Sequence, residues 1–259
     1  MLGVKILFKS LSQIYYNLSD ALKLTGPLYL VMTALNVSVS YFMLGVLSLQ
    51  DIQKLENAEQ IVLTPEYWLA ILILILVNIV FSAWIAVLWH RYMLLSEQPL
   101  DLIPPFRSQV IVAYILATLR VFLVLLAAII PAMVLLAIFA VTGLMSTGVG
   151  IVGFGFIFTA YVFYISLRIS LVLPSRAIGK AMPIGESWHK TGSVGNAIIV
   201  AGILMGTGAY IGQVIGQTVF TNGALLQVFN FVIGWFFVMV SVTILTTLYG
   251  YLVEGRSLD

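Results

Sequence analysis

The chain has 259 residues, of which 61% belong to the apolar and aromatic set AVILMFWYC and only 8% are charged. So few charged side chains cannot cover a protein of this size in water, which excludes a soluble globular domain and leaves lipid as the main covering. The chain has no cysteine, which excludes disulfides and thiolate metal sites. The net charge is +2, and the basic residues are spread over several loops rather than gathered in the basic patch that nucleic-acid binding requires.

The first 25 residues predict an amphipathic helix that lies in the membrane interface. They do not read as a cleaved signal peptide, because polar residues interrupt the apolar stretch and no small-residue cleavage site follows. Gly26 and Pro27 then predict the bend into the first membrane span. The expected apolar face holds Leu7, Leu11, Ile14, Leu18 and Leu22, and the expected polar face holds Lys9, Gln13, Tyr16, Asp20 and Lys23.

Six segments predict membrane-spanning helices. A helix needs about 20 apolar residues to cross the hydrocarbon core, and each segment reaches about that length without an Asp, Glu, Lys or Arg. The sequence therefore predicts an all-α polytopic membrane protein, with residues 1–259 forming one integral membrane domain. The predicted spans are residues 28–49, 69–89, 121–144, 149–167, 197–220 and 225–252.

The charges of the connecting loops predict the orientation of these spans. The loop over residues 50–68 carries four acids and the single base Lys54, and the short loops around Ser146 and Asn222 carry no charge. Because positively charged loops stay in the cytoplasm, both termini are expected there. The other eleven bases all fall on the expected cytoplasmic face: Lys5, Lys9, Lys23, Arg91, Arg107, Arg120, Arg168, Arg176, Lys180, Lys190 and Arg256.

The spans are expected to form three hairpin units, each preceded by a short interfacial helix. Residues 20–26 (DALKLTG) align with residues 186–192 (ESWHKTG), and each stretch leads into a span. Residues 106–119 are expected to form the corresponding helix of the middle unit. One continuous helix from Gln109 to Leu144, about 54 Å long at about 1.5 Å per residue, is the alternative. The hairpin units are residues 28–89, 106–168 and 186–252.

The connection after the fourth span resembles that of a known group of membrane proteins. Residues 168–174 (RISLVLP), followed by residues 186–188 (ESW), are similar to the inter-hairpin connection of YciC-like proteins. They are also similar to the membrane domain that accompanies some glycerophosphodiester phosphodiesterases. The resemblance covers the six-span layout and implies a fold and a bacterial inner-membrane location. It implies no reaction, because the phosphodiesterase domain itself is missing from the sequence.

Three arginines are candidates for contact with an anionic lipid. Arg120 opens the third span, Arg168 closes the fourth, and Arg91 follows the second, so all three are expected at a similar cytoplasmic depth. A guanidinium group offers fork-shaped donors that suit phosphate oxygens. The alternative is that each arginine extends toward the interface and anchors its own helix.

The fifth span carries glycines at the four-residue spacing that lets helix backbones approach closely. This pattern predicts a span that is buried, either inside the bundle or in a contact with a second copy or another membrane protein. Gln213 and Gln217 lie on the same span and are expected to bond neighbouring helices or to line a pathway. The glycines are Gly202, Gly206, Gly208, Gly212 and Gly216.

Two other motifs predict no cofactor or metal site. Residues 148–153 (GVGIVG) match the dinucleotide fingerprint letter for letter. That fingerprint functions between a strand and a helix, whereas here it opens a membrane span. Glu186 and His189 form one Glu-x-x-His pair, whereas a di-iron bundle needs two such pairs and two further glutamates.

The residues favour a non-catalytic protein that acts through contacts with membrane lipids or membrane proteins. No predicted span holds the ionisable groups that coupled transport commonly uses, and two isolated histidines supply little for catalysis. The alternative is a transporter without proton coupling or a permease that translocates lipid. The expected partners are lipids and a possible second copy or membrane protein, with no nucleic acid.

Overall fold

The computed structural model describes residues 1–44, 65–98, 104–220 and 223–258. Within these ranges the chain is helical and contains no strand. Six of the described helices are long and apolar enough to cross a membrane, which confirms the predicted all-α polytopic fold. They are α2 (Leu18–Leu44), α4 (Pro65–Leu95), α5 (Ser108–Val141), α6 (Gly148–Ile169), α9 (Gly195–Val219) and α10 (Gly223–Val253).

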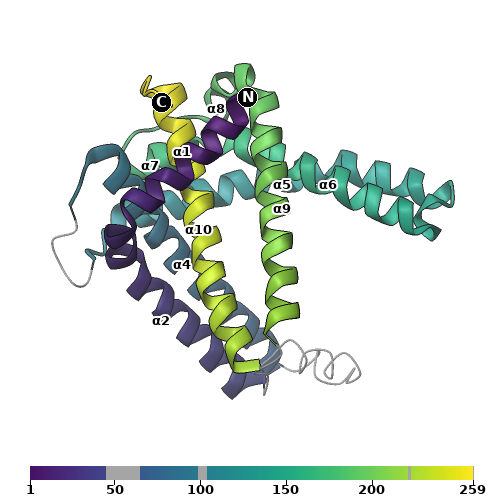
Figure 1. Ribbon diagram of the computed structural model, residues 1–259, viewed down its shortest axis with the longest axis horizontal. Helices are drawn as coiled ribbons and strands as arrows, with labels where there is room; N and C mark the ends of the chain where they lie inside the picture. The colour runs from purple at the N-terminus through teal and green to yellow at the C-terminus, as the bar shows by residue number, and fades with distance from the viewer. Residues whose placement is uncertain (45–64, 99–103, 221–222, 259) are drawn as a thin grey trace.

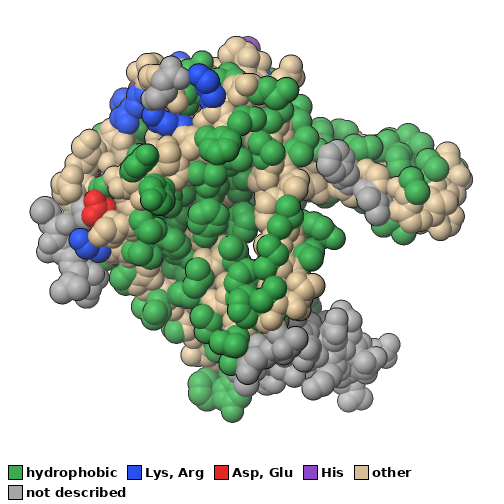
Figure 2. Space-filling model, in the orientation of Figure 1, with side chains coloured by type: hydrophobic (Ala, Val, Ile, Leu, Met, Phe, Trp, Pro, Cys, Tyr) green, Lys and Arg blue, Asp and Glu red, His purple; other side chains and the backbone are tan. Residues whose placement is uncertain are grey.

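Some predictions concern parts of the chain outside the described residues. These are the end of the first span after residue 44, the acidic loop at residues 50–64 and the loop residue Asn222. The two termini lie at the same end of the molecule (Figure 1). Figure 2 shows Lys and Arg side chains gathered at that end, above a surface that is mostly apolar.

The N-terminal helix α1 (Leu2–Tyr16) is shorter than the predicted interfacial helix. Asn17 separates α1 from α2. Its side-chain amide donates to the Gln13 carbonyl at 2.7 Å, and its side-chain oxygen accepts from the Tyr92 hydroxyl at 2.9 Å. The predicted end of the interfacial helix before Gly26 and Pro27 is wrong, because α2 continues through both residues. One local and one tertiary hydrogen bond of Asn17, rather than the Gly-Pro signal, mark the end of α1.

The predicted apolar face of this region is also wrong in part. Leu18 and Leu22 belong to α2 and are exposed, and Leu7 and Leu11 are only partly buried. The reason is that small residues bring α1 directly against α9 and α10. A Cβ at Gly3 would overlap the Ala197 carbonyl oxygen of α9, and Ser10 Oγ donates to Thr247 Oγ1 of α10 at 3.1 Å. The buried residues of α1 are Gly3, Ile6, Ser10 and Ile14.

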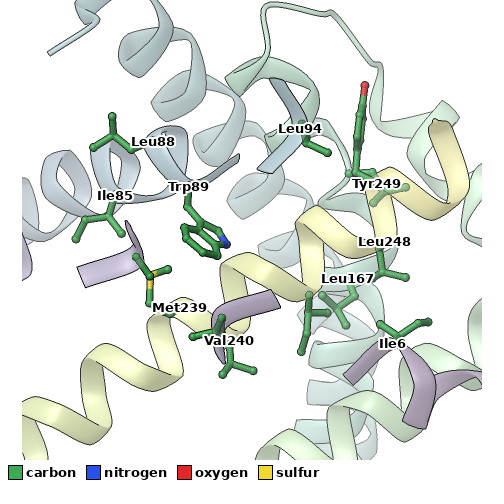
Figure 3. Close-up of a cluster of buried hydrophobic side chains, with 14 of the residues drawn as sticks. Ile6, Ile85, Leu88, Trp89, Leu94, Leu167, Met239, Val240, Leu248 and Tyr249 are labelled. Carbon is green, nitrogen blue, oxygen red and sulfur yellow. The ribbon is translucent and has the colours of Figure 1, made fainter. Parts of the chain in front are cut away.

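The largest buried cluster lies where α1, α4, α10 and the end of α6 meet (Figure 3). Trp89 of α4 and Met239 of α10 are fully buried there. Trp89 Nε1 donates to Thr243 Oγ1 at 2.8 Å, and Trp235 Nε1 donates to Thr25 Oγ1 at 2.9 Å. A buried indole N–H needs an acceptor, so the hydroxyl groups of threonine make aromatic packing possible inside this apolar cluster.

The α5–α6 hairpin projects to one side of the other four long helices (Figure 1). α5 is a single helix that runs through Pro131, so the continuous-helix alternative is confirmed and a separate helix over residues 106–119 is wrong. The turn contains η1 (Leu144–Ser146). Tyr161 of α6 donates to the Ala128 carbonyl of α5 at 2.9 Å, which joins the two helices near the proline.

Short helices follow α6 at the end of the molecule that carries the termini. They are α7 (Val172–Ala177), α8 (Ile184–Lys190) and the 3-10 turn η2 (Gly192–Val194), which leads into α9. The predicted likeness of residues 20–26 to residues 186–192 does not extend to their structure. The first stretch lies inside α2, whereas the second forms most of α8 and the start of η2.

Candidate functional site

Arg168, in the last turn of α6, is enclosed by protein and only 8% exposed. Each nitrogen of its guanidinium donates to a different oxygen: Nε to Thr191 Oγ1 at 3.1 Å, Nη1 to the Tyr164 hydroxyl at 2.7 Å, and Nη2 to the Trp188 carbonyl at 2.6 Å. The guanidinium also lies 3.8 Å from the centre of the Trp188 ring, a cation–π contact. Arg168 therefore binds the α8–η2 segment to α6, and these donors are directed at protein oxygens rather than at lipid.

Ser187 of α8 satisfies the backbone at the break between α6 and α7. Its buried hydroxyl donates to the Arg168 carbonyl at 2.7 Å and accepts from the Leu171 N–H at 3.2 Å. Broken helices are tolerated at membrane depth only where other groups satisfy the freed backbone atoms. Arg168 and Ser187 come from the two stretches that carry the resemblance to six-span proteins, and their contacts here are structural.

Arg91, near the end of α4, is also bound to protein. Its Nε donates to Glu97 Oε2 at 3.0 Å and its Nη1 donates to the Ala177 carbonyl of α7 at 2.9 Å. Nη2 forms an ion pair with Glu97, and Arg107 Nη2 lies 3.0 Å from Glu97 Oε2. The hydrogen bonds from Arg91, aided by the nearby charges of Arg91 and Arg107, hold the pKa of Glu97 below its ordinary value of 4.5.

Arg120 has a different environment. It is exposed on α5, and within the described ranges its side chain makes no hydrogen bond or ion pair. It lines a surface pocket of about 400 Å³ together with Arg176 of α7, whose guanidinium likewise has no protein partner in the described part of the chain. The remaining lining residues are apolar: Val172, Ala181, Met182, Pro183 and Ile184.

The three predicted arginines therefore have different surroundings. Arg91 and Arg168 bind protein groups, whereas Arg120 lines a pocket with Arg176, and no hydrogen bond between described residues joins any two of the three. Sequence reasoning did not single out Arg176, because its position beside α5 depends on the break after α6. Pro174, shortly before Arg176, is the one local signal that indicates such a break.

His90 lies in a second polar cluster, fully buried between α4, α5 and α10. Its Nδ1 lies 2.8 Å from Thr246 Oγ1 and its Nε2 lies 3.4 Å from the Tyr114 hydroxyl. The Thr246 hydroxyl donates to the Val242 carbonyl at 2.8 Å, so it accepts a hydrogen bond from His90 Nδ1–H. The direction of bonding then runs from Tyr114 through His90 and Thr246 to Val242. Both ring nitrogens of His90 are thus used in packing helices together.

Glu186 and His189 are both exposed on α8. Glu186 pairs with Lys190 at 3.8 Å, one turn along the same helix. Within the described residues, no group of three or more His, Cys, Asp or Glu side chains is placed to hold a metal ion.

The glycine fingerprint of residues 148–153 has a structural role at the start of α6. Thr147 caps the helix, and its side chain accepts from the Gly150 N–H at 3.0 Å. A Cβ at Gly150 would overlap the Leu144 carbonyl oxygen, so the tight turn of the hairpin requires glycine there.

The fifth-span glycines divide into two groups. A Cβ at Gly202 would overlap Phe163 of α6, and one at Gly216 would lie 2.6 Å from Phe229 of α10, whereas one at Gly212 would make ordinary contacts with α10. Gly206 and Gly208 are exposed, and a Cβ at either would meet no other heavy atom within 4 Å among the described residues. The expectation of a span buried inside the bundle is wrong for most of α9, and Gln213 and Gln217 are exposed.

These contacts leave the pocket of Arg120 and Arg176 as the candidate site. Two guanidinium groups that have no protein partner among the described residues line this one pocket. No family model, curated protein or solved structure matches this chain.

Proposed function

We propose that this chain is a non-enzymatic protein of the bacterial inner membrane that binds anionic phospholipid at the inner leaflet, with both termini in the cytoplasm. The observation that carries the proposal is the pocket shared by Arg120 and Arg176. Arg91 and Arg168 direct their donors at protein oxygens, whereas these two guanidinium groups do not. A guanidinium fork matches the oxygens of a phosphate, and the apolar lining suits a phosphate that carries acyl chains.

The position of Arg120 along α5 supports a lipid ligand. Residues 121–141, which complete the helix, contain no charged side chain and span about 30 Å at about 1.5 Å per residue. That length matches the hydrocarbon core of a bilayer. If this stretch of α5 crosses the bilayer, Arg120 lies at the edge of the hydrocarbon core, from which its long side chain reaches the lipid phosphates.

Retention of lipid after gentle purification tests the proposal. The variant Arg120→Gln/Arg176→Gln removes both charges and keeps a polar, unbranched side chain, and Lys5→Gln/Lys23→Gln removes two charges from exposed positions outside the pocket. Native mass spectrometry of the full chain, purified in mild detergent from membranes containing phosphatidylglycerol, counts the bound lipid. We expect the arginine variant to lose bound phosphatidylglycerol and the lysine variant to keep it. Equal retention by both variants would contradict the proposal.

A transporter without proton coupling, or a lipid-translocating permease, is the alternative class. Flux of solutes and of fluorescent phospholipid in proteoliposomes separates the two classes. We expect rates equal to those of protein-free vesicles for a protein that only binds lipid.

A further inference from the structure

A second hollow lies beside the arginine pocket and shares Ile184 with it. It also has a volume of about 400 Å³, but its lining is almost entirely apolar. Three helices form its walls. They contribute Val124 and Ala128 from α5, Ile165 and Ile169 from α6, and Ile184, Gly185, Trp188 and His189 from α8.

The two hollows follow one stripe of α5. Arg120, Val124 and Ala128 are four residues apart, a spacing that places them one above another on the same helix face. At about 1.5 Å per residue, the stripe extends about 12 Å from Arg120 along the uncharged part of α5. The cationic pocket therefore lies at one end of the stripe and the apolar hollow lies further into the span.

The wall formed by α8 is held in place by the buried network around Arg168. Ser187, in the middle of α8, bonds the Arg168 carbonyl, and Nη2 of Arg168 bonds the Trp188 carbonyl. Trp188 remains 37% exposed, although its ring lies against the Arg168 guanidinium. A large aromatic side chain is thus fixed at the edge of the hollow before any ligand arrives.

We propose that the two hollows together bind one phospholipid, with its phosphate between Arg120 and Arg176 and one acyl chain between α5, α6 and α8. This inference rests on the proposed function and adds the path of the chain. Charge complementarity fixes the polar end, because no acidic side chain lines either hollow among the described residues. The ligand is therefore an intact anionic phospholipid, and a soluble phosphate ester leaves the second hollow empty.

Photolabelling with a lipid probe tests the path of the chain. The probe is phosphatidylglycerol with a diazirine in the middle of one acyl chain, added to the full chain in nanodiscs and irradiated. Peptide mass spectrometry then locates the label. We expect label on the α5 peptide that contains Val124 and Ala128 and on the α8 peptide that contains Trp188, with glycerol phosphate competing far less than unlabelled phosphatidylglycerol.

Matched variants distinguish the hollow from general lipid contact. Ala128→Trp fills the hollow, whereas Ala127→Trp adds the same bulk at the neighbouring exposed position, which does not line it. Gly185→Leu fills the hollow from α8, where a Cβ has open space. We expect loss of the α5 and α8 label in Ala128→Trp and Gly185→Leu, and full label in Ala127→Trp, with all variants eluting as the parent protein does.

The outcomes separate this inference from the function on which it rests. Label spread evenly over the exposed helices, or unchanged label in Ala128→Trp and Gly185→Leu, would overturn the acyl-chain site. Competition by glycerol phosphate as strong as that by unlabelled phosphatidylglycerol would overturn it too, because the acyl chain would then add nothing to binding. In those cases lipid retention that still depends on Arg120 and Arg176 leaves the proposed function standing, and retention that does not depend on them removes both.

Discussion

At the scale of single residues, arginines with the same charge have different roles at one end of this molecule. Arg168 is buried and bound to three protein oxygens, Arg91 bridges α4, α7 and Glu97, and Arg120 and Arg176 line an open pocket. A sequence gives the position of each charge along a helix but not the acceptors around it. Two of the three acceptors of Arg168, Trp188 and Thr191, lie 20 and 23 positions further along the chain, beyond a helix break, which is why Arg168 was expected to contact lipid.

The carboxylate of Glu97 predicts a pH dependence of stability. Its pKa in the folded protein lies below the ordinary 4.5 because Arg91 donates hydrogen bonds to it. A group with a lowered folded pKa stabilises the fold above its unfolded pKa, and this stabilisation disappears as pH falls through the folded value. We expect Glu97→Gln to lower the melting temperature at neutral pH and to match the parent protein well below about pH 4.

Thermal unfolding in detergent across this pH range measures the effect of Glu97. Glu66→Gln, at the exposed opposite end of α4, is the control and is expected to melt like the parent protein at every pH. A deficit for Glu97→Gln that persisted unchanged into acid would assign its effect to packing rather than to the ion pairs.

At the scale of helices, the sequence predicts the six spans well but not their ends. Length and apolar content identify a membrane helix from local residues alone, and each predicted span overlaps one long described helix. The ends depend on distant groups. Asn17 ends α1 with help from Tyr92, while Pro27 and Pro131 are carried inside helices. Proline is tolerated in membrane helices where neighbours satisfy the freed backbone groups.

The contact between α6 and α9 predicts unequal effects at two glycines of one helix. Gly202→Val places its side chain against Phe163, whereas Gly206→Val meets open space, and the two changes alter helix propensity equally. We expect the first to cost roughly 1–3 kcal/mol of stability, as overpacked sites do, and the second to cost much less. Melting temperatures in detergent compare the two variants. A larger loss for Gly206→Val would instead indicate that another helix covers that face of α9.

At the scale of the whole molecule, the distribution of charge agrees with the arrangement of the chain. Both termini and most of the visible basic side chains share one end (Figures 1 and 2), as an even number of crossings requires. The α5–α6 hairpin, however, leaves the other four long helices and projects sideways. The hydropathy of α5 and α6 predicts both helices of this hairpin. No local signal in the sequence predicts the angle between the hairpin and the other four long helices.

Cysteine labelling tests the proposed orientation and the path of this hairpin. The chain has no cysteine of its own, so single substitutions have no background. In intact cells, a membrane-impermeant maleimide is expected to label Glu66→Cys and Ser146→Cys but to label Lys180→Cys only after permeabilisation, because bases remain on the inner side. Labelling of Lys180→Cys from outside would reverse the orientation, and an unlabelled Ser146→Cys would show that the hairpin does not cross.

The hydrogen bonds between α4 and α10 limit how this protein can rearrange. Adjacent side chains of α4, Trp89 and His90, reach Thr243 and Thr246, which lie about one turn apart on α10. Turning α10 by one residue, about 100°, or shifting it by one turn would break both bonds where water cannot replace them. These two bonds therefore fix the register of α10 against α4. If the proposed lipid binding moves the protein, we expect the movement in the projecting α5–α6 hairpin and the short helices beside it rather than between α4 and α10.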